Sequence, residues 1–351
     1  MPKSFEFTIR KLSRRNEPYI FLVLLALCLL IEFRSGQFFS SNNIVDIASA
    51  MIVPGLFAIC AFMVLVSGGI DVSFPALASL STYATTKLLL DVNYEGGVWL
   101  PILMAVVIGA LLGAFNGLFI GYFQLPALIV TLGSSSVFKG IMQGALNAKQ
   151  LTIIPVGMRE FGTSALFVAK NAASGLTSKM SVSFIAFAVV LFLAFLMLKY
   201  SMFGRSIYAI GGNETSALRA GISVKKTKFL MYILVGMIAS LGGVIRTCMM
   251  QQCHPTNMLG MEMNIIAGVV LGGTSITGGL GSLSGCMLGT LLIVIVENSL
   301  ILIGVPTSWR SVFVGALIII GTAVSAYQVS RMTKGTKKSR VKARREKEAL
   351  R

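Results

Sequence analysis

Apolar runs separated by short polar or glycine-rich segments fill most of the chain. A helix that crosses about 30 Å of hydrocarbon needs roughly 20 apolar residues, and several of the runs reach that length. The pattern therefore predicts an all-α polytopic integral membrane protein with about ten transmembrane helices, some of them broken by glycine. We expect these spans at 19–33, 44–66, 74–90, 99–123, 126–146, 181–198, 229–250, 264–271, in a glycine-interrupted run that ends at 303, and at 309–327.

Basic residues gather at the two termini and in one internal loop. Lys and Arg are enriched on the cytoplasmic side of membrane proteins. We therefore expect cytosolic basic segments at 1–18 and 330–351, on either side of a transmembrane domain at 19–329. The same rule places the loop at 204–228 inside and the polar stretch at 147–180 outside.

The composition supports a membrane protein, because 55% of the residues are hydrophobic and only 12% are charged. A soluble domain carries about 25% charged residues. The net charge of +17 would suggest nucleic acid as the partner of a soluble protein. Here the charge is largely terminal, where it can meet anionic membrane lipid, and aromatic residues do not interleave with it. We predict a lipid partner and no nucleic acid.

The five cysteines lie mostly within apolar runs and show no CxxC spacing. This arrangement argues against a disulfide framework and against a zinc site, and we predict no bound metal. Cys248 and Cys253 lie close enough in sequence to pair, but two packed thiols are the favoured interpretation.

Two glycine pairs interrupt apolar runs, Gly68-Gly69 and Gly272-Gly273. Asp71 and Ser73 follow the first pair and Thr274 follows the second, which indicates a weak internal duplication at a spacing of 272 − 68 = 204 residues. A broken helix exposes backbone groups, and these are tolerated at membrane depth only where they line protein or water. Such groups suit a neutral polyhydroxylated solute.

Several polar residues within or beside the spans are candidates for the pathway or its gate. Asp71 is the first, because an ionisable residue beside a span is a functional candidate by default. The alternative is a helix cap at the start of the third span, with the glycine break mattering more than the charge. Glu262 has the same ambiguity, and the others could equally bond between helices. The full candidate set is Gly68, Gly69, Asp71, Ser73, Asn116, Thr131, Glu262, Gly272, Gly273, Thr274 and Asn298.

The loop at 204–228 contains a short predicted helix. Asn213 can cap its start, Glu214 falls in its first turn, and Gly221 can stop it. We expect Ala217 and Ala220 to give it a small face that enters a groove on a partner, with Arg219 near an acidic rim. An ordinary solvated loop is the alternative. The docking candidates are Gly212, Asn213, Glu214, Ala217, Arg219 and Gly221.

No catalytic or nucleotide-binding motif is present in the sequence. The glycine-rich run at 272–285 lacks the GK[ST] of a phosphate loop, and HExxH and GxSxG are also missing. We therefore expect a non-catalytic chain without a cofactor of its own. Any use of ATP needs a nucleotide site on another chain.

Three segments also carry a family resemblance: FGRSIYAIGGNETSALRAGI at 203–222, SGGIDVS at 67–73, and MEMNIIAGVVLGGTSITGGLGS at 261–282. Together they resemble the permease subunits of bacterial ABC sugar importers of the ribose, xylose and autoinducer-2 group, over about 19–327. The resemblance implies a passive pathway for a simple sugar, in the bacterial cytoplasmic membrane, with both termini cytosolic. It implies a second permease chain, identical or paralogous, and an extracytoplasmic sugar-binding protein. It also implies a cytosolic ATPase subunit that binds ATP and Mg and docks on the 204–228 loop.

Two other classes of protein remain as alternatives. A stand-alone secondary carrier or facilitator for a small polar solute would need an intramembrane carboxylate relay. For that relay the chain offers only Asp71, Glu262 and Glu297. A membrane enzyme that acts on lipid-linked sugars would need clustered Asp or His at the membrane surface, and the sequence contains a single histidine, His254.

Overall fold

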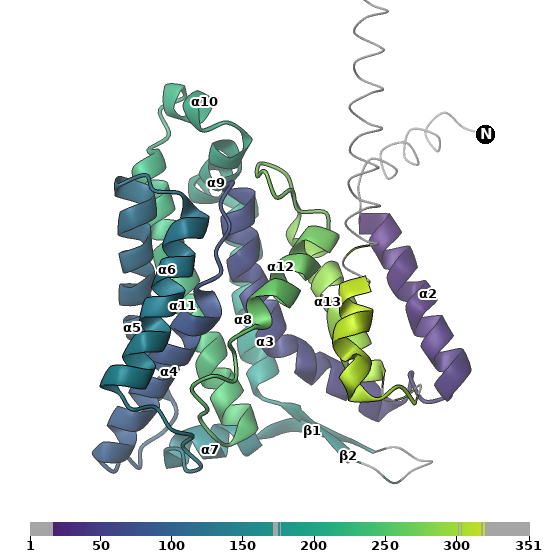
Figure 1. Cartoon of the computed structure of the whole chain (residues 1–351). Helices are drawn as coiled ribbons and strands as arrows, with labels where there is room; N and C mark the ends of the chain where they lie inside the picture. The colour runs from purple at the N-terminus through teal and green to yellow at the C-terminus, as the bar shows by residue number, and fades with distance from the viewer. Residues whose placement is uncertain are drawn as a thin grey trace, which may run out of the picture.

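The computed structural model describes residues 17–170, 175, 177–300, 302, 304–316 and 319. Helices make up most of this part of the chain, and Figure 1 shows them packed side by side as a bundle. The first half contains α2 (Glu17–Ser35), α3 (Ser41–Val66), α4 (Phe74–Asp91), α5 (Trp99–Gly117) with the π-helical turn η1 (Leu118–Tyr122), α6 (Ala127–Gly140) with η2 (Ile141–Ala145), and α7 (Val156–Thr163). The second half contains α8 (Ser183–Tyr200), α9 (Met202–Gly212), α10 (Glu214–Arg219), α11 (Val224–Met250), α12 (Met261–Leu271), α13 (Leu283–Ser299) and the 3-10 turn η4 (Thr307–Trp309).

The all-α prediction is confirmed for the bundle, with one addition. Strands β1 (Ala165–Lys170) and β2 (Thr177–Ser181) pair antiparallel within the stretch that the sequence predicted only as polar. Figure 1 shows this hairpin with α7 at one end of the bundle and α9 and α10 at the other. We call the second of these the α10 end.

The helices follow the predicted spans. Five are long and apolar enough to cross a membrane by length and composition, namely α2, α3, α5 with η1, α8 and α11. The apolar helices α12 and α13 are shorter, because the second glycine break separates them. Residues 1–16 and 330–351, and most of the predicted tenth span, lie outside the described residues, so the predicted domain boundaries stay predictions.

The core is centred on α3 and α11, both of which contact α4. From Leu56 to Val66 every residue of α3 is buried. Glycines bring α5 close to α11, because a Cβ on Gly109 or Gly113 would overlap the α11 backbone. Polar side chains of α4 are buried as well, among them Ser81, whose hydroxyl donates to Ser240 Oγ of α11 at 2.8 Å. A helix that carries so many hydroxyl groups lies inside the protein rather than against lipid.

Both predicted glycine breaks end their helices in the same way. Gly68 has a φ of +86° and donates to Leu65 O, while Gly69 donates to Val64 O. In the second break Gly273 has a φ of +88° and donates to Val270 O, while Thr274 donates to Val269 O. These are the two bonds of the Schellman motif, in which glycine supplies the left-handed residue.

The duplication stays a prediction, because α10 ends in the same motif at Gly221. The two breaks match each other in a register that differs from the predicted one. Gly68 corresponds to Gly273 rather than to Gly272, a spacing of 273 − 68 = 205 residues. Gly272 corresponds to Ser67, the C-cap residue of α3, and both have ordinary right-handed backbone angles. In the sequence, the first glycine of one pair matches the first glycine of the other. In the fold, the equivalent residues are the two with positive φ, Gly68 and Gly273.

Candidate functional site at the glycine breaks and the α10 end

The first break leads into a buried polar network. Ser73 donates both its N–H and its hydroxyl to Asp71 Oδ1, each at 2.7 Å. Asn116 of α5 donates from Nδ2 to Ser73 Oγ at 2.8 Å. All three side chains are at most 3% exposed. The network fixes the direction in which the chain enters α4.

Thr131 of α6 holds the same segment from another side. Its hydroxyl accepts the N–H of Val72 at 3.3 Å and lies at the same distance from Ile70 O. Four of the predicted pathway residues, Asp71, Ser73, Asn116 and Thr131, thus come together although they lie on three separate stretches of the chain. Their hydrogen bonds are made to other groups of the protein. This favours the interpretation of Asp71 as a capping residue over its interpretation as a residue that lines an open pathway.

The second break is more exposed. Thr274 is buried, and its hydroxyl finds no hydrogen-bond partner among the described residues. Gly272 packs on Gly285 of α13 so closely that a Cβ there would overlap the Gly285 carbonyl. The loop beyond carries the exposed side chains of Ile276 and Leu280 before α13 begins.

The remaining pathway candidates make local bonds. Glu262 accepts the N–H of Gly260 at 2.9 Å in the first turn of α12, as a capping residue does. Asn298 donates to Val294 O one turn earlier in α13. Glu297, which the sequence analysis considered only for a carboxylate relay, makes a longer-range bond: it accepts from the amide of Asn264 at 3.0 Å and so joins α13 to α12. None of the three bonds to the first network within the part of the chain that is described.

The predicted helix in the 204–228 loop is present as α10, and both of its ends are as expected. Asn213 Oδ1 accepts the N–H of Ser216 at 2.8 Å. Gly221 has a φ of +83° and donates to Leu218 O, and Ile222 donates to Ala217 O. The sequence did not predict that α9 precedes it as a separate helix, which Ser201 caps by accepting the N–H of Gly204 at 3.0 Å.

The direction of the small face of α10 differs from the expectation. Ala217 is 3% exposed and packs within the chain against Ile210 and Val224. The groove it enters is therefore formed by α9 and α11. Ala220, the other residue of the predicted small face, is exposed. Leu218 is 56% exposed, and Arg219 beside it is exposed too.

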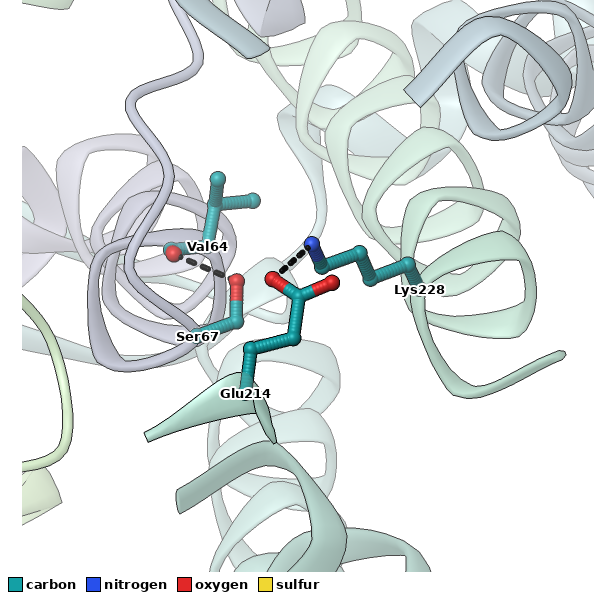
Figure 2. Close-up of polar contacts among 4 residues, drawn as sticks. All are labelled: Val64, Ser67, Glu214 and Lys228. Atoms are coloured by element: carbon teal, nitrogen blue, oxygen red, sulfur yellow. Dashed lines mark hydrogen bonds and ion pairs between the residues drawn. The ribbon is translucent and has the colours of Figure 1, made fainter. Parts of the chain in front are cut away.

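A cavity of about 350 Å³ lies between α10, the first break and the corner between α5 and α6. Glu214 of α10 reaches across to Lys228 of α11, with 2.8 Å between Oε2 and Nζ. Figure 2 shows this pair beside the end of α3, where the Ser67 hydroxyl turns to Val64 O at 2.7 Å. The lining residues are Ser67, Gly68, Gly69, Ile120, Gln124, Leu125, Pro126, Ala127, Ile210, Gly211, Asn213, Glu214, Lys228, Met231, Tyr232 and Thr277.

The cavity brings together two features that were separate in the sequence, the first glycine break and the predicted docking helix. Tyr232 and Gly211 complete its wall, and no pattern in the sequence distinguishes either of them. The Tyr232 side chain is 1% exposed and its hydroxyl has no partner among the described residues. A lone tyrosine in an apolar run carries no local signal, because its position depends on how α11 packs against α5 and α3.

The chain matches the family model described as "Branched-chain amino acid transport system / permease component" over residues 43–322. It belongs to this family. As a permease component it is similar to the ribose import permease protein RbsC of Escherichia coli (strain K12), with 29% identity covering 86% of this chain and 91% of the relative. It is 33% identical to the D-allose transport system permease protein AlsC of the same strain, over 87% and 89% of the two chains.

The autoinducer 2 import system permease protein LsrC of Yersinia enterocolitica is 28% identical, over 92% of this chain and 84% of the relative. No solved structure matches the chain. The family is named after amino acid transport, whereas these relatives are named after sugars and autoinducer 2. The predicted resemblance to this group of permeases is therefore confirmed over most of the permease.

Proposed function

We propose that this permease is the transmembrane pathway subunit of an ATP-driven importer for a simple sugar, a ribose-like monosaccharide or related polyol. The observation that carries the proposal is the similarity to ribose and allose permeases over most of both chains. It favours an importer subunit over a stand-alone secondary carrier. The buried network around Asp71 agrees with this choice, because Asp71 bonds to Ser73 rather than to a second carboxylate.

The α10 end supplies the docking site for a cytosolic ATPase subunit in this proposal. That subunit would bind ATP and Mg, because this chain has no nucleotide-binding motif and needs no cofactor of its own. Leu218 is the exposed apolar residue of α10, and Arg219 beside it offers a charge. A short exposed helix with one apolar anchor suits a groove on a partner. The capped ends, Asn213 and Gly221, hold it in shape.

A second permease chain, identical or paralogous, would complete the pathway along α6 and η2. Part of their exposed surface is small and polar, beside the exposed apolar side chains of Leu132, Val137 and Ile141. The small polar face is unfavourable against lipid but suits a second chain and a water-filled path. No side chain or backbone lies within 4 Å of the Cβ position at the glycines of this face. The residues of the face are Gly133, Ser136, Gly140, Gln143 and Gly144.

The orientation in the bacterial cytoplasmic membrane follows from the basic residues, with both termini and α10 in the cytosol. An extracytoplasmic sugar-binding protein would then meet the end of the bundle that carries α7 and the hairpin. A thiol at the exposed Ser164 should react from outside intact cells, and one at Arg219 only after permeabilisation. The five native cysteines are all buried and free, so their background labelling is low. If Ser164→Cys is labelled only after permeabilisation, the protein has the opposite orientation in the membrane to the one proposed.

The function is tested by reconstitution of the chain in liposomes with its ATPase and binding protein, with D-ribose and D-allose as solutes. We expect uptake that requires ATP on the ATPase side and no ion gradient. Uptake by this chain alone, driven by a proton or sodium gradient, would contradict the proposal and favour the secondary carrier.

The docking assignment is tested with Leu218→Asp. We expect loss of ATPase association in a pull-down, with unchanged folding, because the side chain is exposed. Met202→Asp is the matched control, since Met202 is an exposed apolar residue of the neighbouring α9. Ala217→Trp is a poorer test, because it would disturb the packing of α10 on its own chain. Full association of Leu218→Asp would show that the ATPase binds elsewhere.

A further inference from the structure

The last turn of α9 is in backbone contact with both glycine breaks. At Gly211 a Cβ would overlap Val66 O at the end of α3 and would lie 2.6 Å from Gly279 N in the loop between α12 and α13. The next residue, Gly212, has nothing within 4 Å of its Cβ position. Two adjacent glycines thus differ completely in their surroundings, and only the first requires the absence of a side chain.

The two breaks also touch each other at this point. Gly279 donates its N–H to Val66 O at 2.8 Å. A Cβ on Gly278 would lie 2.7 Å from Gly68 Cα, so the two backbones pass without side chains between them. Gly278 and Gly279 have φ values of +88° and +74°, which glycine adopts at little cost.

One side chain adds a bond to this backbone contact. Tyr208 of α9 donates from its hydroxyl to Gly281 O at 3.2 Å. It lies three residues before Gly211, so it is on the same face of α9. The end of α9 is therefore attached to the second break through a hydrogen bond and to the first through direct backbone packing.

We infer that Gly211 is a positioning residue that transmits the movement of α9 and α10 to both glycine breaks at once. The inference rests on the proposed function, in which an ATPase moves α10. Backbones in direct contact leave no flexible side chain to absorb a displacement, so a shift of α9 has to move Val66 and Gly279 with it. The cavity under α10, spanned by Glu214 and Lys228, leaves room for such a shift on the other side.

The test compares Gly211→Ala with Gly315→Ala in the assembled transporter with its ATPase and binding protein. Gly315 also has nothing within 4 Å of its Cβ position, and it lies outside the docking helix and both breaks. The readout is the number of sugar molecules taken up per ATP hydrolysed, which a purely structural role would not change in protein that assembles normally. We expect Gly211→Ala to bind the ATPase and hydrolyse ATP while the uptake per ATP falls at least tenfold. Gly315→Ala should behave as the wild type. Wild-type uptake per ATP in assembled Gly211→Ala would overturn the inference.

If Gly211→Ala does not reach the membrane, a second variant tests the same inference. Tyr208→Phe keeps the ring and removes only the bond to Gly281 O. We expect uptake per ATP to fall about fivefold, the factor that corresponds to one neutral hydrogen bond of about 1 kcal/mol. An unchanged ratio in assembled Tyr208→Phe would contradict the inference.

The failure of this inference is distinguishable from the failure of the proposed function. If the wild-type chain takes up neither sugar with ATP, or does not bind the ATPase, the proposed function is wrong. If the wild type transports with ATP and both variants do so with the same ratio, only the role of Gly211 and Tyr208 is wrong.

Discussion

The two glycine breaks share one backbone motif and differ in what surrounds it. After Gly68 the chain turns back into the bundle, and Asp71, Val72 and Ser73 are all buried. After Gly273 the chain leaves the bundle in a loop with the exposed residues Ile276 and Leu280. Figure 1 shows the first link running along the inside of the bundle and the second looping out near α9.

This difference indicates that stopping a helix and fixing the chain beyond it are separate tasks. The Schellman motif stops both helices with two backbone bonds and one glycine. The first break then gains a buried side-chain network from Asp71, Asn116 and Thr131. The loop after the second break gains a part-buried bond from Tyr208 to Gly281 O, and no buried network of this kind is present there among the described residues. Segments with few buried contacts open more easily than segments with many. We therefore expect the first break to contribute more to stability and the second to change shape more readily.

The largest effect should follow the removal of the acceptor at the first break. Asp71→Leu leaves the buried N–H and O–H donors of Ser73 without an acceptor, which costs about 2–6 kcal/mol of unfolding free energy for two such groups. Asp71→Asn keeps an acceptor oxygen and should cost about 1 kcal/mol or less, with transport largely intact. Thermal unfolding of the purified protein in detergent measures the difference.

Thr274→Val is the matched change at the second break. The Thr274 hydroxyl is buried without a partner among the described residues, so its replacement by a methyl group removes no bond. We expect a change within about 0.5 kcal/mol, or a slight gain. Equal losses for Thr274→Val and Asp71→Leu would mean that the two breaks are held in the same way.

A smaller loss of stability, with a loss of transport, should follow Gly69→Val. The Cβ of a residue at 69 would lie 3.2 Å from Ala127 Cβ and from Val64 Cγ1, which is tighter than ordinary contact. Overpacking of this kind costs about 1–3 kcal/mol. Because Gly69 lines the cavity under α10, we expect sugar uptake to fall in protein that still assembles. Full uptake would count against a gating role for the first break.

The most symmetrical effect should follow alanine at the two positive-φ glycines. Gly68→Ala and Gly273→Ala each place a side chain in the left-handed region, at a cost of about 1–2 kcal/mol. We expect equal shifts of the melting temperature for the two variants. A clearly larger shift at one of them would show that surrounding contacts, rather than the shared motif, dominate there.

The sequence was most informative where a structure depends on neighbouring residues. Asn213 and Gly221 predicted the ends of α10, and the glycine pairs predicted both breaks, because caps and stops are local. The hydrophobic runs predicted the helices for a similar reason. The hairpin of β1 and β2 was missed because its strands are short and do not alternate: β1 is a continuous apolar run and β2 is mostly polar.

The sequence was least informative where a structure depends on distant contacts. The small side chain of Ala217 would suit either a partner's groove or the protein's own interior. Only its packing against α9 and α11 shows that it faces inward. Gly211 and Gly212 are the same residue type, and the sequence cannot distinguish them. They differ in the fold because Val66 O lies against the Cβ position of Gly211 and nothing lies near that of Gly212. The candidates at the first break were selected one by one, and the contacts across α5 and α6 were needed to make them one network.

Hydrogen exchange in the assembled transporter tests most directly whether α9 links the two breaks. The amides to follow are those in 66–73 and 272–282, among them Gly69, which bonds to Val64 O, and Gly279, which bonds to Val66 O. We predict that ATP changes the exchange of both segments together in the wild type, and of neither in Gly211→Ala. A change in one segment alone, with the wild-type ATPase bound and active, would contradict the account.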